Sequence, residues 1–203
     1  MFPFDVILFD VGGVLLTNGW DHRERAAVLD QFHLDHAAFE ARHPQPNDAW
    51  ERDAISLDEY LTATVFYEPR SFTRDEFFAA MCAQSQLLAD SALPILEELA
   101  ALGHCRLGAL NNEARATNDY RFATYGLRRS LDFAFSSCYV GLRKPESAIY
   151  KRAIDILGCP PERILLIDDR AENTTAASKA GMRSIQFLSS ASLRETLTTF
   201  SIL

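Results

Sequence analysis

The sequence predicts an α/β fold: a Rossmann-like parallel sheet with helices on both faces, plus a small all-helical cap. Two observations predict it. Five short, mostly apolar segments punctuate the chain, and helix-like sequence separates the last four of them. Short apolar runs that alternate with helices are typical of the buried strands of a parallel sheet. The interval between the first two apolar segments is long and contains only helix-like sequence.

The core elements can be placed in order. The five expected strands cover residues 6–9, 106–110, 133–135, 164–167 and 183–188. Three expected helices cover residues 91–102, 145–157 and 171–180. Each of these helices stops before a glycine, which is common just past a helix end. Pro145 is expected at the first helical position of the second helix, where proline is favoured.

The interval between the first two strands is predicted to be helical throughout. Three amphipathic segments are expected to form helices, at residues 21–34, 56–66 and 73–85. Ser56 and Thr73 are expected to cap two of them, because an acid follows each shortly after. The stretch HPQPND at residues 43–48 is expected to be a breaker loop. The expected division of the chain is a core of residues 1–16 and 90–203 and a helical cap of residues 17–89.

Composition and charge argue against several classes of function. The formal net charge of the 203 residues is -8, whereas a nucleic-acid groove would need a basic face. The four cysteines form no C-x-x-C pair, so a zinc or redox motif is not indicated. The start of the chain, MFPFDVILFD, lacks the basic region of a signal peptide, and no apolar run approaches the ~20 residues of a membrane span. We therefore expect a cytoplasmic protein that binds neither membrane nor nucleic acid.

Polar residues follow four of the five predicted strands. They are Asp10; Asn111, Asn112 and Glu113; Ser136 and Ser137, with Lys144 a little later; and Asp168, Asp169 and Asn173. Each could instead be a turn or helix-cap residue, but together they would meet at the carboxyl edge of the sheet, where α/β proteins bind ligands. Clustered carboxylates repel one another unless a cation is bound, and Mg²⁺ prefers oxygen ligands and substrate phosphate. A lysine beside such a site would neutralise phosphate oxygens.

In this order, the segments resemble the motifs of the haloacid dehalogenase-like superfamily, in particular its phosphatase-type branch with a helical cap after the first strand. "FDVGGVL" resembles the first motif, and "LGALNNE" occupies the second. "GLRKPESAIY" resembles the third, and "ILLIDDRAENTTAASKAGM" the fourth. The resemblance covers essentially the whole chain. It implies hydrolysis of a small phosphorylated metabolite with Mg²⁺ as cofactor.

The resemblance also implies residue roles. A carboxylate oxygen of Asp10 would attack phosphorus to form an aspartyl-phosphate, which water then hydrolyses. Asp10, the backbone carbonyl of Gly12 and Asp169 would hold Mg²⁺, with Asp168 helping directly or through water. These roles are what the family's pattern implies for the matching positions.

The remaining motif residues would bind substrate or support the loops. Lys144 would balance the negative charge of nucleophile and phosphate. Asn111 and Asn112, with the neighbouring backbone, would hydrogen-bond the phosphoryl oxygens. Asn173 would orient the loop of the fourth motif.

The sequence departs from the family's pattern at two positions. Gly12 stands where the family usually has a second Asp, which protonates the leaving oxygen and later activates water. General acid–base catalysis is typically worth ~10²–10⁴-fold, so its loss matters. Asn111 stands where Ser or Thr is usual, but an amide can still donate a hydrogen bond to phosphate.

Three interpretations therefore compete. In the first, the protein is a phosphatase whose substrate has a better leaving group, such as a sugar 1-phosphate, or whose cap supplies the proton; Asp21 and His22 are candidates. In the second, it is a metal-independent 2-haloacid dehalogenase-like hydrolase, although such a site has little use for Asp168 and Asp169 together. In the third, it is a non-catalytic relative that binds a phosphorylated ligand or a partner protein. The identity of the substrate and the oligomeric state cannot be deduced from the sequence.

Overall fold

Residues 2–203 are described by a computed structural model. Its centre is one parallel sheet with the strand order β3-β2-β1-β4-β5. The strands are β1 (Val6–Phe9), β2 (Arg106–Asn111), β3 (Phe133–Ser136), β4 (Ile164–Asp168) and β5 (Arg183–Gln186). All five strands that the sequence predicts are present, and the last is shorter than expected. The α/β prediction is confirmed.

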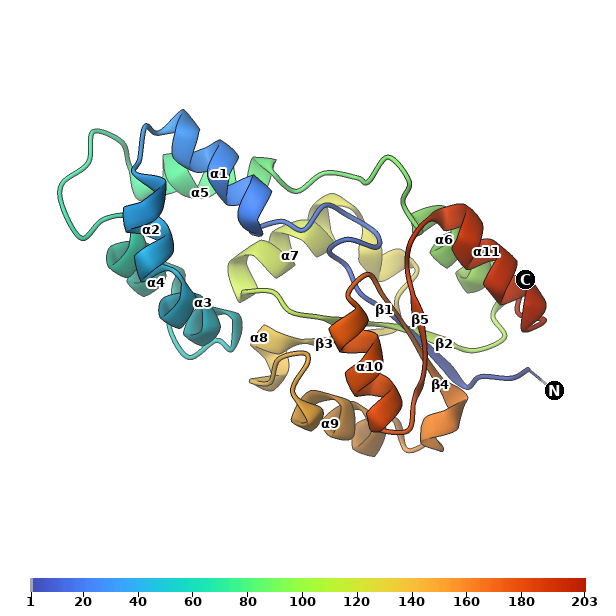
Figure 1. Cartoon of the computed structure of the whole chain (residues 1–203). Helices are drawn as coiled ribbons and strands as arrows, with labels where there is room; N and C mark the ends of the chain where they lie inside the picture. Colours follow the sequence, from blue (N-terminus) through green and yellow to red (C-terminus); the bar gives the residue numbers. More distant parts are fainter. Residues whose placement is uncertain (1) are drawn as a thin grey trace.

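Helices cover both faces of this sheet (Figure 1). One face carries α6 (Leu93–Leu102), α7 (Arg115–Thr124) and α11 (Ser190–Thr199). The other carries α9 (Ser147–Leu157) and α10 (Ala171–Lys179). Alternate residues of β1 explain both layers: Ile7 and Phe9 pack into the first cluster, whereas Val6 and Leu8 pack into the second. A strand buried on both faces must be apolar throughout, as β1 is.

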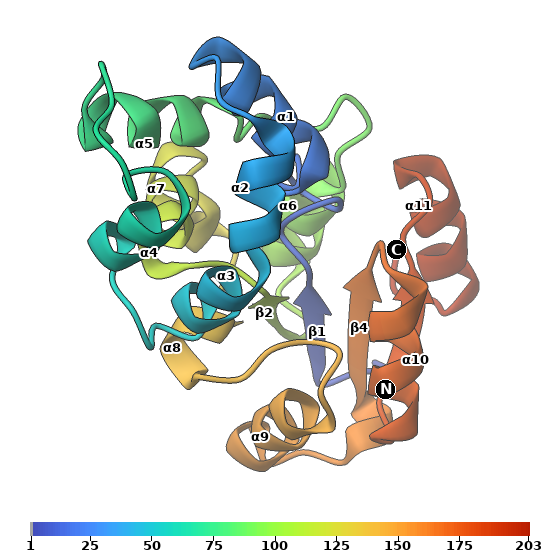
Figure 2. The ribbon, with the colours of Figure 1, turned by 60° about the vertical axis from the view of Figure 1, so that its left-hand side comes forward.

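Five helices lie together beyond the end of the sheet toward which the strands point (Figures 1 and 2). They are α1 (His22–Gln31), α2 (His36–Arg42), α3 (Pro44–Glu51), α4 (Leu57–Thr64) and α5 (Arg74–Ala83). We keep the predicted bounds, residues 17–89, for this segment and call it the cap. The cap has a hydrophobic cluster of its own, in which Trp50 stacks on Tyr60 at a centroid distance of 4.3 Å. Its helices therefore bury their apolar faces against one another.

The cap helices correct one prediction and confirm another. Residues 43–48 do not form a breaker loop, because Pro44 begins α3. Proline is tolerated in the first helical turn, where the backbone N–H has no partner within the helix. Ser56 and Thr73 do cap α4 and α5, each in a reciprocal capping box with the glutamate three residues later.

One helix start in the core also differs from expectation. Pro145 is not the first helical residue of α9, because Glu146 is the N-cap and the helix begins at Ser147. A short helix, α8 (Ser137–Val140), follows β3, and turns of 3₁₀ helix occupy residues 127–129 and 161–163.

Within residues 2–203, no helix combines the length and the apolarity that a membrane crossing requires.

The two chain segments that join cap and core lie side by side. The Thr17 backbone N–H donates to the Gln86 carbonyl at 2.8 Å, and the Thr17 hydroxyl donates to the Gln84 carbonyl at 2.7 Å. The guanidinium of Arg121 on α7 is fully buried and donates to the Thr17 carbonyl at 2.6 Å. The same guanidinium pairs with Glu113 at 2.7 Å, so this junction is tied to the core.

Candidate active site

Two strand-end acids and a loop lysine form a buried cluster at the carboxyl edge of the sheet. Asp10 directly follows β1, Asp168 ends β4, and Lys144 lies in the loop between α8 and α9. The Lys144 Nζ lies 2.9 Å from Asp10 Oδ2 and 2.6 Å from Asp168 Oδ2. Lys144 is only 4% exposed and Asp10 7%. The structure thus brings together the predicted nucleophile and the predicted lysine.

Burial dominates the electrostatics of this cluster. It raises the pKa of Asp10 to about 7, against the opposing pull of the Lys144 charge. Burial alone would lower the pKa of Lys144, but the attraction of Asp10 and Asp168 outweighs it and the pKa is raised. The pKa of Asp169 is also raised, by burial and by its neighbour Asp168. One lysine is therefore too little positive charge for three neighbouring carboxylates.

The three carboxylates are arranged to share a cation. Asp10, Asp168 and Asp169 each offer an oxygen, and these oxygens lie within 4.8 Å of one another. Asp169 Oδ1 is buried and has no hydrogen-bond partner in the described part of the chain. An orphaned carboxylate oxygen beside other carboxylates fits a hard divalent cation such as Mg²⁺. Gly13 permits this approach: its φ is +72°, and a Cβ there would lie 2.3 Å from Asp169 Oδ2.

Asp168 is the most heavily engaged of the three acids. Its Oδ2 accepts from Lys144, and its Oδ1 accepts from the Arg170 backbone N–H at 2.9 Å and from Asn173 Nδ2 at 2.9 Å. Asn173 is therefore placed to hold the loop that follows β4. Among the residues that the structure describes, each oxygen of Asp10 has a single partner, the Val11 N–H at 2.8 Å and Lys144 at 2.9 Å. Asp169, which has an unpartnered oxygen over the same range, is the best placed of the three to ligate a cation directly.

The two asparagines of the second motif occupy different places. Asn112 donates to the Lys144 carbonyl and accepts from the Lys144 N–H, both at 2.8 Å, so it fixes the backbone of the lysine loop. Asn111 is buried, donates to Asn118 at 2.9 Å and accepts from Ser136 at 2.8 Å. Asn112 lines the cavity that is described next, and Asn111 does not. Only one of the two asparagines therefore faces that cavity.

A cavity of about 340 Å³ lies between the cap and the edge of the sheet. The core contributes Asp10, Gly12, Asn112, Glu113, Arg143, Lys144, Pro145, Glu146, Arg170, Glu172 and Asn173, and the cap contributes Asn18, Trp20, Asp21, Arg25, Asn47 and Glu51. Asp21, a predicted candidate, lines the cavity and pairs with Arg170 at 2.7 Å. His22, the other candidate, is not among the lining residues.

Sequence reasoning missed the cavity residues of α3 and the arginines next to the motif residues. Both Asn47 and Glu51 lie on α3. Asn47 falls within the expected loop of residues 43–48 and Glu51 just after it, so no helical face could be drawn through them. Arg143 and Arg170 each directly neighbour a motif residue, and that adjacency was the one available signal.

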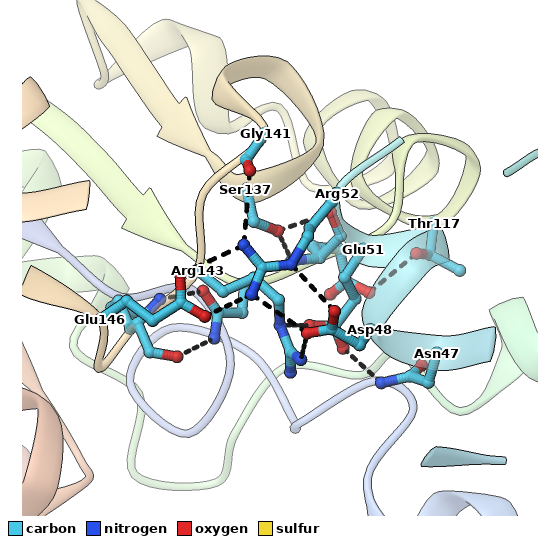
Figure 3. A network of polar contacts seen from close by, with 12 residues as sticks. Asn47, Asp48, Glu51, Arg52, Thr117, Ser137, Gly141, Arg143 and Glu146 are labelled. Carbon is cyan, nitrogen blue, oxygen red and sulfur yellow. Dashed lines mark hydrogen bonds and ion pairs between the residues drawn. The ribbon is translucent and has the colours of Figure 1, made fainter. Parts of the chain in front are cut away.

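Ion pairs join α3 to the loop that carries Lys144 (Figure 3). Arg143 of the loop contacts Asp48 at 2.6 Å and Glu51 at 2.7 Å. Arg52, just past α3, pairs in return with Glu146. A fourth pair joins Asp53, just past α3, to Arg115 on α7 at 2.6 Å. We call these four contacts the α3 clamp.

A family model described as haloacid dehalogenase-like hydrolase matches residues 4–181. Among curated proteins, "Bifunctional epoxide hydrolase 2" of Rattus norvegicus is 28% identical over 94% of this chain, which spans 38% of that protein's length. "Flavin mononucleotide hydrolase 1" of Arabidopsis thaliana is 28% identical over 86% of this chain and 74% of its own length.

Solved structures share the fold at lower identity. A magnesium complex of a HAD family enzyme from Bacteroides thetaiotaomicron has a TM-score of 0.75 and 17% identity, covering 91% of this chain and 93% of its own. A 2-haloacid dehalogenase from Pseudomonas syringae has a TM-score of 0.68 and 17% identity, covering 97% of this chain and 99% of its own. The fold is therefore shared with a magnesium-bound HAD family enzyme and with a 2-haloacid dehalogenase.

Proposed function

The chain belongs to the haloacid dehalogenase-like hydrolase family, and we propose that it is a Mg²⁺-dependent phosphatase of small phosphorylated metabolites. One observation carries the proposal: Lys144 Nζ lies 2.9 Å from the Asp10 carboxylate, beside two further acids at positions 168 and 169. A nucleophile placed between an ammonium and a cation-binding cluster suits attack on an anionic phosphoryl group. The names of two relatives support this reaction class: one is a flavin mononucleotide hydrolase and the other a glyceraldehyde 3-phosphate phosphatase.

In this proposal, the chain's own residues divide the work. A carboxylate oxygen of Asp10 attacks phosphorus, and the bond from phosphorus to the leaving oxygen breaks. Lys144 stabilises the negative charge on the phosphoryl oxygens, while Asp168 and Asn112 hold its side chain and its backbone. Mg²⁺ bound by Asp10, Asp169 and the Gly12 carbonyl would supply further positive charge to the phosphoryl group.

The substrate class follows from the cavity. Its volume of about 340 Å³ suits a small metabolite, and charged or amide side chains dominate its lining. Asn111 enters the proposal as a positioning residue, because its side chain is committed to Asn118 and Ser136. The cytoplasmic location stays a prediction.

The experiment is a comparison of two reactions. With MgCl₂, the protein should hydrolyse p-nitrophenyl phosphate, and both chelation by EDTA and the isosteric Asp10→Asn variant should abolish turnover. A panel of phosphorylated metabolites then identifies the substrate. Metal-independent halide release from 2-chloropropionate would instead establish the dehalogenase interpretation. Binding of phosphate esters without any turnover would establish the non-catalytic one.

A further inference from the structure

The proposed chemistry lacks a proton donor at the position where the family has one. Gly12 lines the cavity beside Asp10, and glycine has no group that transfers a proton. Aryl phosphates do not need this help, because a phenolate is a good leaving group. Alkyl phosphates release a strongly basic alkoxide, which must be protonated as the bond breaks. Hydrolysis of alkyl phosphates would therefore need another acid on the walls of the cavity.

Five carboxyl groups besides Asp10 line the cavity, and four of them are engaged or exposed. Asp21 pairs with Arg170 at 2.7 Å, and Glu146 pairs with Arg52. Glu113 accepts from Thr117 at 2.8 Å through one oxygen and from Arg121 at 2.7 Å through the other. Glu172 is exposed in the first turn of α10. Asp21, Glu146 and Glu113 each accept hydrogen bonds through both oxygens, and Glu172 has free access to water.

Glu51, the last residue of α3, is different. Its Oε1 accepts from Asn47 at 3.0 Å, which fixes the carboxyl group. Its Oε2 is buried and forms no hydrogen bond within residues 2–203. Arg143 Nε forms an ion pair with this oxygen at 2.7 Å but is not oriented for a hydrogen bond, whereas Nη1 of the same guanidinium donates to Asp48 at 2.6 Å. A buried carboxyl oxygen without a donor is expected to be protonated more readily than a solvated one.

The charges around Glu51 act in both directions. Burial raises the pKa of this carboxyl group and Arg143 lowers it, with a net rise. Asp48 on the same helix raises it further. Glu113, at the end of β2, and Tyr60, on α4, also lie within electrostatic reach of Glu51.

We propose that Glu51, supplied by the cap, is the general acid and base that replaces the side chain missing at Gly12. The inference rests on the proposed phosphatase function. In the first step, Asp10 forms a bond to phosphorus, the bond to the leaving oxygen breaks, and the Glu51 proton passes to that oxygen to give the alcohol. In the second step, the Glu51 carboxylate takes a proton from water as its oxygen attacks phosphorus. The bond from phosphorus to Asp10 breaks, so inorganic phosphate and the starting enzyme result.

The test exploits the difference between leaving groups. Turnover of p-nitrophenyl phosphate is compared with turnover of glycerol 3-phosphate and glucose 6-phosphate, all with saturating MgCl₂. Glu51→Gln should lower kcat/KM for the alkyl phosphates by about 10²–10⁴-fold, the usual value of general acid catalysis. It should leave kcat/KM for the aryl phosphate close to wild type, because kcat/KM reports the first step alone, and it should lower kcat for both classes through the slower second step. Glu51→Ala provides the same contrast without placing an amide donor beside Arg143, should the glutamine variant be unstable.

Asp58→Asn is the control. Asp58 lies on α4 of the cap, pairs with Arg74, and does not line the cavity. Its loss should leave the ratio of aryl to alkyl turnover unchanged. The inference is overturned if Glu51→Gln lowers kcat/KM of both classes by the same factor, or if the wild type hydrolyses the aryl phosphate alone. Absence of turnover with every phosphate would instead refute the proposed function itself.

Discussion

At the scale of single residues, Lys144 is the side chain on which the site depends most. It is fully enclosed between Asp10 and Asp168, and both contacts are shorter than 3.0 Å. Removing one member of a buried ionic cluster leaves the other charges uncompensated, which usually costs more than the pair contributed.

Lys144→Met should therefore abolish phosphatase turnover and lower the free energy of unfolding by about 3 kcal/mol, as for other broken buried pairs. Urea unfolding followed by circular dichroism, in buffer without Mg²⁺, measures the stability change. Lys151→Met is the control, because Lys151 is exposed on α9 and should leave both quantities near wild type. Equal stability of the two variants would show that Lys144 does not hold the acids together.

The motif residues could be predicted from the sequence because their positions depend on the sheet alone. Asp10, Lys144, Asp168 and Asp169 follow strands whose carboxyl ends meet at one edge, and the structure brings them together there. The site of Asn111 could not be predicted, because its side chain turns toward Asn118 on a later helix. Whether this side chain faces the cavity or the helix depends on packing, which the spacing of the strands in the sequence does not describe.

At the scale of elements, α3 joins the cap to the catalytic edge. The strands and most core helices could be predicted from periodicity, but α3 could not, because its first turn contains two prolines. Without that helix, Glu51 and the clamp residues have no predicted position. Contacts between cap and core are tertiary, and a local sequence pattern carries no information about them.

Arg52→Ala should loosen the α3 clamp without unfolding the cap. Arg52 pairs with Glu146 across the boundary between cap and core, and partly exposed pairs usually contribute at most ~1 kcal/mol. We expect KM to rise and the radius of gyration from small-angle X-ray scattering to increase, while the melting temperature changes little. The control is Arg74→Ala, since Arg74 pairs with Asp58 inside the cap and should alter neither KM nor the radius. Indistinguishable scattering from Arg52→Ala and wild type would show that the clamp does not hold the cap.

At the scale of the whole molecule, the α3 clamp makes cap closure depend on pH. Hydrogen bonds from Arg52 lower the pKa of Asp48 and of Glu146, and Arg115 lowers that of Asp53. A carboxyl whose pKa is depressed by folding stabilises the folded form above its ordinary pKa of about 4, and this stabilisation is lost as the pH falls through the depressed value.

Acidification below pH ~4 should therefore separate the cap from the core before either one unfolds. Scattering should show the radius of gyration rising, while the helical circular dichroism signal stays native because the helices of cap and core remain folded. High salt should shift the opening to higher pH by screening the pairs. Simultaneous changes in scattering and circular dichroism would mean that cap and core unfold as one unit.

The central claim is that Asp10 becomes phosphorylated during turnover. Wild-type protein is mixed with p-nitrophenyl phosphate and MgCl₂, quenched in acid within the first turnover, digested, and analysed by mass spectrometry. The account predicts a phosphoryl group on the peptide that contains Asp10, at Asp10 itself, and none on the same peptide of Asp10→Asn. Turnover by wild type with the phosphoryl group on another residue, or on none, would contradict it.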